Sequence, residues 1–217
     1  LSAPARYHVR GMAINIVTKD YAGTNQLSGQ IIGGLVQNKY AKGFGDLYLS
    51  MQRGKFGLDA QYKLVNGNSY GESSRIANHP LGNNRVYYND ETGQKSFGIT
   101  HDYRLGMNYA FSKNHRLDVA YTGHWDKRCS NSNTTGSSIS GMHHDSHEYL
   151  HNVDVNYSLP FGLTLNGSYT YYRTPQQQAL DGTMHTDESM PETERNLTSG
   201  SEQTINKWMF TADQTHS

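Results

Sequence analysis

In the stretch KFGLDAQYKLV, residues 55–65, an apolar or aromatic side chain stands at every second position. The apolar set is Phe56, Leu58, Ala60, Tyr62 and Leu64. Side chains alternate across a β-strand, so the stretch predicts a strand with one apolar face. Four later stretches repeat the pattern, with apolar positions at Ile99, Tyr103, Leu105, Met107, Tyr109 and Phe111, at Leu117, Val119, Tyr121 and Trp125, at Tyr149, Val153, Val155, Tyr157 and Leu159, and at Phe161, Leu163, Leu165, Tyr169 and Tyr171.

The opposite face of these predicted strands is polar and partly charged. It carries Asp59, Asp102, Arg104, Asp118, Asp154 and Asn156. The dry core of a β-sandwich would not accept these side chains, because burying an unpaired charge is costly. An apolar outer face with a polar inner face is instead typical of a β-barrel that stands in lipid.

Aromatic residues on the apolar face fall into two groups, one at each end of the predicted sheet, when successive strands are taken to run antiparallel. One end collects Phe56, Tyr109, Phe111, Tyr157 and Phe161, and the other end collects Tyr62, Trp125, Tyr149, Tyr169 and Tyr171. Aliphatic residues lie between the two groups. Aromatic rings prefer the headgroup levels of a membrane, so the pattern predicts two girdles around an apolar band. A soluble β-sandwich would explain the alternation but not this sorting.

The composition is that of an all-β chain. Its 217 residues include 22 Gly and 16 Tyr, which favour turns and strands. No run approaches the roughly 20 apolar residues of a transmembrane helix, and 19 acidic against 19 basic residues leave no basic field for nucleic acid. The single cysteine, Cys129, cannot form an internal disulfide, and we expect a free thiol in a polar loop. The chain opens on Leu1 without a secretory signal, and we expect a piece of a longer protein.

The connections between the predicted strands alternate between short and long. The strands cover Gln26–Gln37, Gly45–Arg53, Lys55–Val65, Ser96–Phe111, His115–Asp126, Ser146–Leu159, Phe161–Arg173 and Thr204–Asp213. Short turns are expected at Gly54, Ser112–Asn114 and Pro160, and long polar loops at Asn66–Lys95, Lys127–Asp145 and Thr174–Gln203. This arrangement is typical of outer-membrane barrels, whose long loops face outward. We therefore predict an all-β, antiparallel up-and-down transmembrane barrel segment of about eight strands, incomplete because its first and last strands do not pair.

The segment ahead of the first predicted strand carries a second motif. Its residues are Arg6, Tyr7, Gly11, Ile14, Asn15, Ile16, Thr18 and Lys19. The motif resembles the closing strands of the plug domain in TonB-dependent outer-membrane receptors, and the strands that follow are similar to the receptor-like barrels of Bacteroidota. The glycine-rich stretch before Ile14 is shorter than in the family. An ordinary buried strand would also account for Ala13–Lys19 taken alone.

The resemblance implies two regions and a function. Residues 1–20 would be the carboxy-terminal end of a plug-like domain, and residues 21–217 would be barrel strands with long extracellular loops. The implied location is the outer membrane of a Gram-negative bacterium, with membrane lipid and a TonB-type energy-coupling protein as partners. The implied activity is active uptake of a scarce nutrient, whether a small molecule, a peptide or a glycan. The alternative is a small self-contained outer-membrane barrel with a structural or adhesive role.

Catalytic arrangements are weak in this sequence. His101 and Asp102 are adjacent in a predicted strand, so their side chains point to opposite faces and cannot form a base and its orienting group. Asp102 shares its face with Arg104, and charges inside a barrel lumen usually pair with one another or with a plug. We therefore predict no enzymatic activity and no cofactor.

A histidine-rich stretch, residues 143–148, offers ligand types that suit a divalent metal. The candidates are His143, His144 and His147. The stretch straddles a predicted loop and the start of a strand. Ordinary solvated loop polarity explains the stretch better than a metal site does, and we therefore predict no metal site there.

Overall fold

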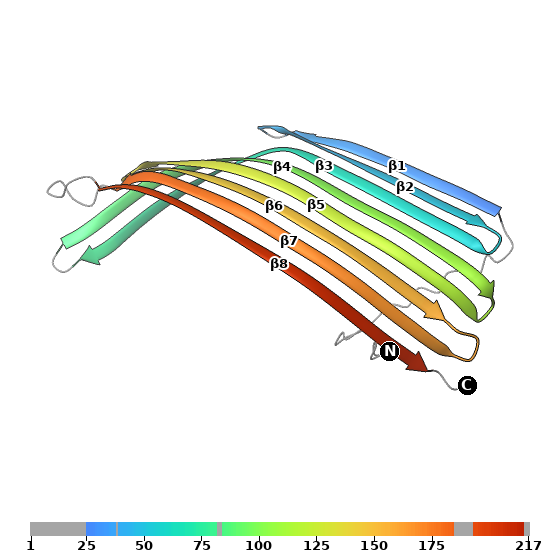
Figure 1. The fold of residues 1–217 in the computed structure, drawn as a ribbon. Coiled ribbons are helices and arrows are strands. Elements are labelled where there is room, and N and C mark those ends of the chain that lie inside the picture. Colours follow the sequence, from blue (N-terminus) through green and yellow to red (C-terminus); the bar gives the residue numbers. More distant parts are fainter. Residues whose placement is uncertain (1–24, 38, 82–83, 185–192, 215–217) are drawn as a thin grey trace.

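The computed structural model describes residues 25–37, 39–81, 84–184 and 193–214. They form one antiparallel sheet of eight strands whose spatial order is the order of the sequence. The strands are β1 (Asn25–Gln37), β2 (Ala41–Arg53), β3 (Phe56–Leu81), β4 (Asn84–Ser112), β5 (His115–Gly136), β6 (Ser138–Ser158), β7 (Leu163–Met184) and β8 (Thr193–Gln214). Figure 1 shows the sheet as a curved, open wall with β1 and β8 at its two edges.

The sheet does not close on itself within the described residues. There β1 pairs only with β2, and β8 pairs only with β7. The predicted all-β, up-and-down topology and the predicted lack of pairing between the first and last strands are therefore confirmed. The two edge strands each leave one row of backbone amide and carbonyl groups without a strand partner.

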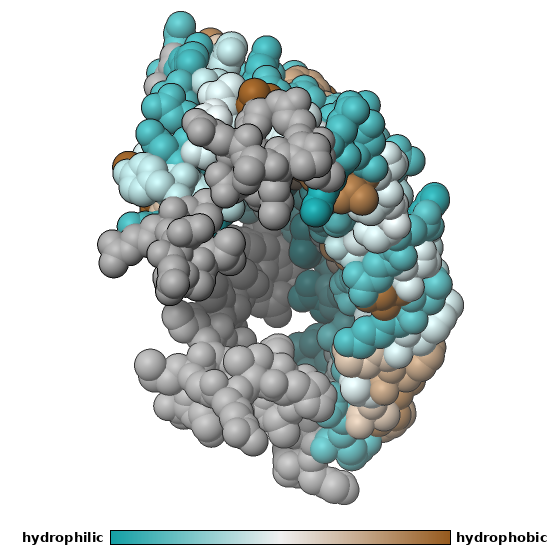
Figure 2. Space-filling model, turned by 90° about the vertical axis from the view of Figure 1, so that its left-hand side faces the viewer, coloured by the Kyte–Doolittle hydropathy of each residue, from teal (hydrophilic) through white to brown (hydrophobic). Residues whose placement is uncertain are grey.

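The strand register places the predicted apolar residues on one face of the whole sheet. Met107 pairs with Leu58 on one side and with Val119 on the other, and Val119 pairs with Val155. Directly paired residues point to the same side of a sheet, so the apolar face is continuous across these strands. Figure 2 shows the sheet as a wall around a hollow, with hydrophilic residues toward the hollow and hydrophobic ones gathered on the lower outer side. We therefore call the apolar face the outer face and the polar face the inner face.

No hydrophobic side chain is buried anywhere in the described part of the chain. Leu105 is 43 % exposed, Val155 37 % and Trp208 66 %. The described strands pair only with their neighbours in this single sheet, and no second sheet lies over the outer face among the described residues. The β-sandwich alternative is therefore excluded for this part of the chain.

The three stretches predicted as long loops are instead, in their described residues, strand extensions that form long β-hairpins. The ladder between β3 and β4 continues past Asn66↔Ile99 as far as Leu81↔Asn84, and β5 and β6 remain paired up to Thr134↔Ser140. The prediction was wrong because both faces of these extensions are polar, so they lack the apolar alternation from which strands were recognised. Backbone hydrogen bonds continue the ladder there without an apolar face.

The short turns lie where the sequence analysis expected them. They are Gly54–Lys55, Lys113–Asn114 and residues 159–162, and they share the end of the sheet opposite the long hairpins. Gly54 has φ +57° and Gly162 has φ +82°, a region that favours glycine. At the opposite end Gly136 has φ +131° beside Ser137, whose amide donates to the Asn89 carbonyl at 3.1 Å. Glycine therefore marks tight reversals at both ends of the sheet.

Candidate functional site

Acidic and basic side chains pair with one another on the inner face. Arg104 Nε lies 3.3 Å from an Asp59 carboxylate oxygen across β3 and β4. His124 Nδ1 lies 2.6 Å from Asp102 Oδ1 across β4 and β5. The pairing follows from the register, which sets residues of opposite charge on adjacent strands within reach of each other. The expectation that charges on this face pair among themselves is confirmed at these positions.

His101 and Asp102 do not form a catalytic pair. His101 lies on the outer face, where its Nδ1 is 2.6 Å from the Tyr62 hydroxyl, whereas Asp102 lies on the inner face with His124. Two more hydrogen bonds of this type join outer-face residues, between His115 and Tyr157 and between His151 and Tyr121, both at 2.7 Å. Sequence reasoning missed these pairs, although the histidines stand at positions in phase with the apolar residues.

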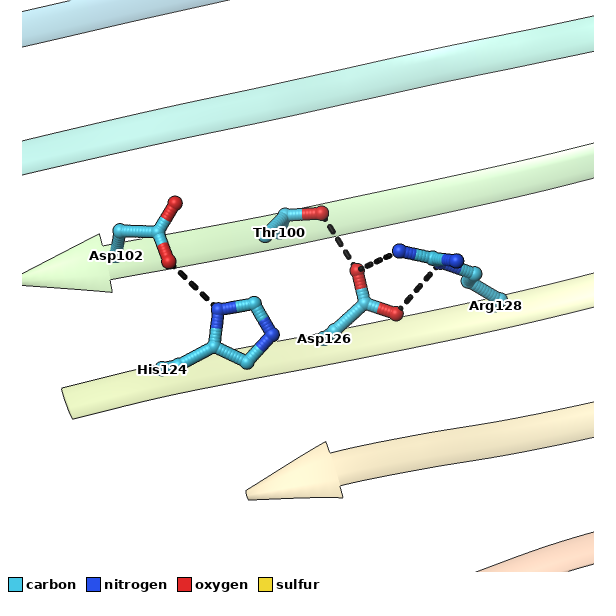
Figure 3. A network of polar contacts seen from close by, with 5 residues as sticks. All are labelled: Thr100, Asp102, His124, Asp126 and Arg128. Carbon is cyan, nitrogen blue, oxygen red and sulfur yellow. Dashed lines mark hydrogen bonds and ion pairs between the residues drawn. The ribbon is translucent and has the colours of Figure 1, made fainter. Parts of the chain in front are cut away.

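Asp126 is the most deeply buried charged side chain in the described part of the chain, at 3 % exposure. The Thr100 hydroxyl donates to Asp126 Oδ1 at 2.6 Å, and Arg128 Nε lies 2.8 Å from Oδ2. Figure 3 shows these three residues beside the Asp102–His124 pair, all on strands β4 and β5. Glu148 stands directly opposite Asp126 on β6, so the guanidinium of Arg128 offsets the Asp126 charge where a second carboxylate lies nearby. Nothing in the sequence singles out Asp126, because its importance depends on the register.

An open hollow of about 410 Å³ lies on the inner face next to this network. Its polar lining includes Gln61, Lys63, Asp102, Arg104, His124 and Glu148. Among the described residues Lys63 and Glu148 form no ion pair, so one cation and one carboxylate remain free to meet a solute. With an amide and an imidazole beside them, these groups can bind a polar solute that carries hydroxyls or charges of both signs.

The residues predicted as metal candidates do not converge on one point. Alternation along β6 puts His143 and His147 on the outer face and His144 on the inner face. His143 Nε2 lies 2.8 Å from Asp145 Oδ2, and its Nδ1 lies 2.6 Å from Asn131 Oδ1. The ring of His147 stacks on Tyr149 instead, with 6.2 Å between ring centroids. Of the three candidates, the structure places only His143 in a polar cluster.

The plug-like motif lies outside the described residues. Its members are Arg6, Tyr7, Gly11, Ile14, Asn15, Ile16, Thr18 and Lys19.

Comparisons with known proteins give this chain no family. No model of a known protein family matches it, and neither does any curated protein. In the described residues no helix is long and apolar enough to cross a membrane.

Removing Arg128 should destabilise the fold, because the Asp126 carboxylate would keep only Thr100 as a partner. We expect Arg128→Gln to lower the free energy of unfolding by about 1–3 kcal/mol. The matched control is Arg116→Gln, since Arg116 and Asp118 form an ion pair whose side chains are 54 % and 37 % exposed. That change should cost less than about 1 kcal/mol. Urea unfolding followed by tryptophan fluorescence measures both, and equal losses would contradict the importance of burial at Asp126.

Proposed function

We propose that this chain forms part of the wall of an outer-membrane β-barrel of the TonB-dependent receptor type, which takes up a scarce nutrient. The observation that carries the proposal is the outer face, which is apolar, continuous and, in the described part of the chain, uncovered. In water such a large apolar surface would be unfavourable, and soluble monomers rarely expose one. In a bilayer the acyl chains cover it, and no second sheet is needed.

Aromatic rows at two levels support a membrane position for this face. Phe56 pairs with Tyr109 near the short turns, and Trp125 pairs with Tyr149 near the long hairpins. The strand from Leu117 to Trp125 spans about 27 Å. At the usual tilt of a barrel strand this corresponds to roughly 20 Å of membrane thickness, close to the apolar band of about 25 Å found in such barrels. The polar hairpins then extend beyond the bilayer on the side of Trp125.

The open edges favour a larger barrel over a small self-contained one. A barrel of eight strands would require β1 to pair with β8, and in the described residues these strands are the two edges of the sheet. In lipid the unpaired backbone groups of an edge must find partners, which further strands of a wide barrel would supply. A wide lumen also leaves room for water around Asp59, Asp102 and Arg104. The receptor assignment itself rests on the resemblance of the motif between Arg6 and Lys19.

Uptake can be tested with a strain that lacks the full-length protein. It should grow more slowly than the parent when one nutrient class is limiting, and iron chelates, vitamins, oligosaccharides and peptides are the classes to compare. Dissipating the proton gradient of the inner membrane should stop uptake while ligand binding at the surface continues, because the proposed coupling draws energy from that gradient. Equal growth of the two strains on all four classes, or uptake that survives the loss of the gradient, would favour the structural or adhesive barrel.

A single arginine can distinguish the lipid face from the lumen face. Val155→Arg should lower the free energy of unfolding in lipid vesicles by about 2–4 kcal/mol, because the charge would enter the apolar band. Asn156→Arg is the matched control, since the next residue points to the inner face and pairs directly with Asp118. We expect that control to cost less than about 1 kcal/mol. A similar cost for both variants, measured by urea unfolding in the same vesicles, would argue against lipid at the outer face.

A further inference from the structure

A cluster of possible metal ligands lies on the outer face of the β5–β6 hairpin. Cys129, His143 and Asp145 bring one sulfur, one nitrogen and one carboxylate oxygen within 4.8 Å of one another. Cys129 pairs directly with Asp145, and His143 is the next residue of β6 on the same face. Directly paired side chains are the closest neighbours across two strands, so the ladder itself brings these groups together. The cluster lies beyond the Trp125–Tyr149 pair, toward the hairpin tip.

The imidazole of His143 is already oriented for a ligand role. Its Nδ1 donates to Asn131 Oδ1 at 2.6 Å, and Asn131 is the residue directly opposite on β5. Its Nε2 therefore points to the other side, where Asp145 Oδ2 lies 2.8 Å away. Metal-binding histidines almost always donate their second ring N–H to an oxygen acceptor, which fixes the ring. Asn131 provides that acceptor here.

The Asp145 carboxylate forms hydrogen bonds with both His143 and Cys129. The hydrogen bond from His143 holds the pKa of the Asp145 carboxyl below its ordinary value. Burial, and then the hydrogen bond to Asp145, raise the pKa of the Cys129 thiol. Both of the other possible ligands therefore lie within hydrogen-bond reach of the Asp145 carboxylate.

We propose that Cys129, His143 and Asp145 bind a zinc ion, with Asn131 as the residue that positions His143. Zinc takes thiolate, imidazole and carboxylate ligands at about 2.0–2.3 Å in a tetrahedron, which requires donor atoms roughly 3.3–3.8 Å apart. Small side-chain rotations that move the donor atoms by about 1 Å bring them to that spacing. Zinc would bind the Cys129 thiolate and the neutral imidazole of His143, so binding releases the thiol proton to solvent, and water takes the fourth position. The thiolate disfavours calcium and magnesium, which prefer oxygen ligands.

The zinc site would cross-link β5 to β6 between the Trp125–Tyr149 pair and the hairpin tip. Because it joins two strands that are already paired, the metal would stabilise the hairpin without changing its register. It uses none of the inner-face residues and does not depend on the proposed uptake function.

Zinc binding can be measured on the protein in detergent after treatment with a chelator. We expect one zinc ion per chain, and cobalt in its place should give a thiolate-to-metal charge-transfer band. Cys129→Ser should abolish the band, because Cys129 is the single cysteine of this chain. Cys129→Ser and His143→Ala should each weaken zinc binding at least 100-fold. Asn131→Ala should weaken it about 10–100-fold, as expected for a residue that orients a ligand.

Two histidine controls and one isosteric variant make the test specific. His144→Ala removes the adjacent histidine on the inner face, and His147→Ala removes the stacked histidine on the outer face, so both should bind zinc as the parent does. Asp145→Asn keeps the shape of the side chain but removes its charge, and it should lose zinc while remaining folded by circular dichroism. Stoichiometric zinc binding that survives in Cys129→Ser and His143→Ala, or a folded parent protein that binds no zinc, would overturn the proposal.

Discussion

The cross-strand hydrogen-bond ladder is the interaction on which the rest of this structure depends. It runs without a break between β3 and β4 from Phe56↔Tyr109 to Leu81↔Asn84. A globular domain holds its sheet with a buried apolar core, but the described residues bury no hydrophobic side chain. The ladder and the side-chain pairs across it therefore hold these strands together, while the apolar face remains available to an apolar environment.

The alternation of side chains between the two faces of the sheet also determines which face carries the charged residues. Every polar residue in phase with Asp59 must lie on the inner face, where its nearest neighbours are other polar residues of the adjacent strands. Gly106 shows how closely they meet, since a Cβ atom there would lie 2.2 Å from Asp59 Oδ1. The missing side chain makes room for the carboxylate, which then reaches Arg104. The same arrangement that pairs these charges leaves Lys63 and Glu148 open to a solute.

The strands between the two aromatic rows could be predicted from the sequence because only there does one face require apolar residues. The extension of β3 beyond Val65 carries no such requirement, and its Gly, Asn and Ser residues have the composition of a loop. The Cys129 cluster was missed for the same reason, since Cys129 and Asp145 stood in a predicted loop. A hairpin centred on Ser137 would have brought them together, because both are equally distant from that residue. The histidine pattern suggested a metal, but only the register selects His143 over His144 and His147.

The outer face of β6 changes its chemistry along its length. Val155 and Val153 come first, His151 and Tyr149 follow, and Asp145 lies toward the tip. The neighbouring strand changes in parallel, because the ladder pairs Trp125 with Tyr149 and Cys129 with Asp145. β5 and β6 run in opposite directions, so the order of residue types along one strand is the reverse of the order along the other. Local sequence propensity alone gives no reason for the residue types to change at the same level of the sheet. The proposed membrane surface would explain the agreement, with aliphatic residues needed on one side of it and polar residues permitted on the other. In the proposed membrane position the hairpins would lie outside the bilayer, where a site such as the Cys129 cluster can arise without cost to the apolar band.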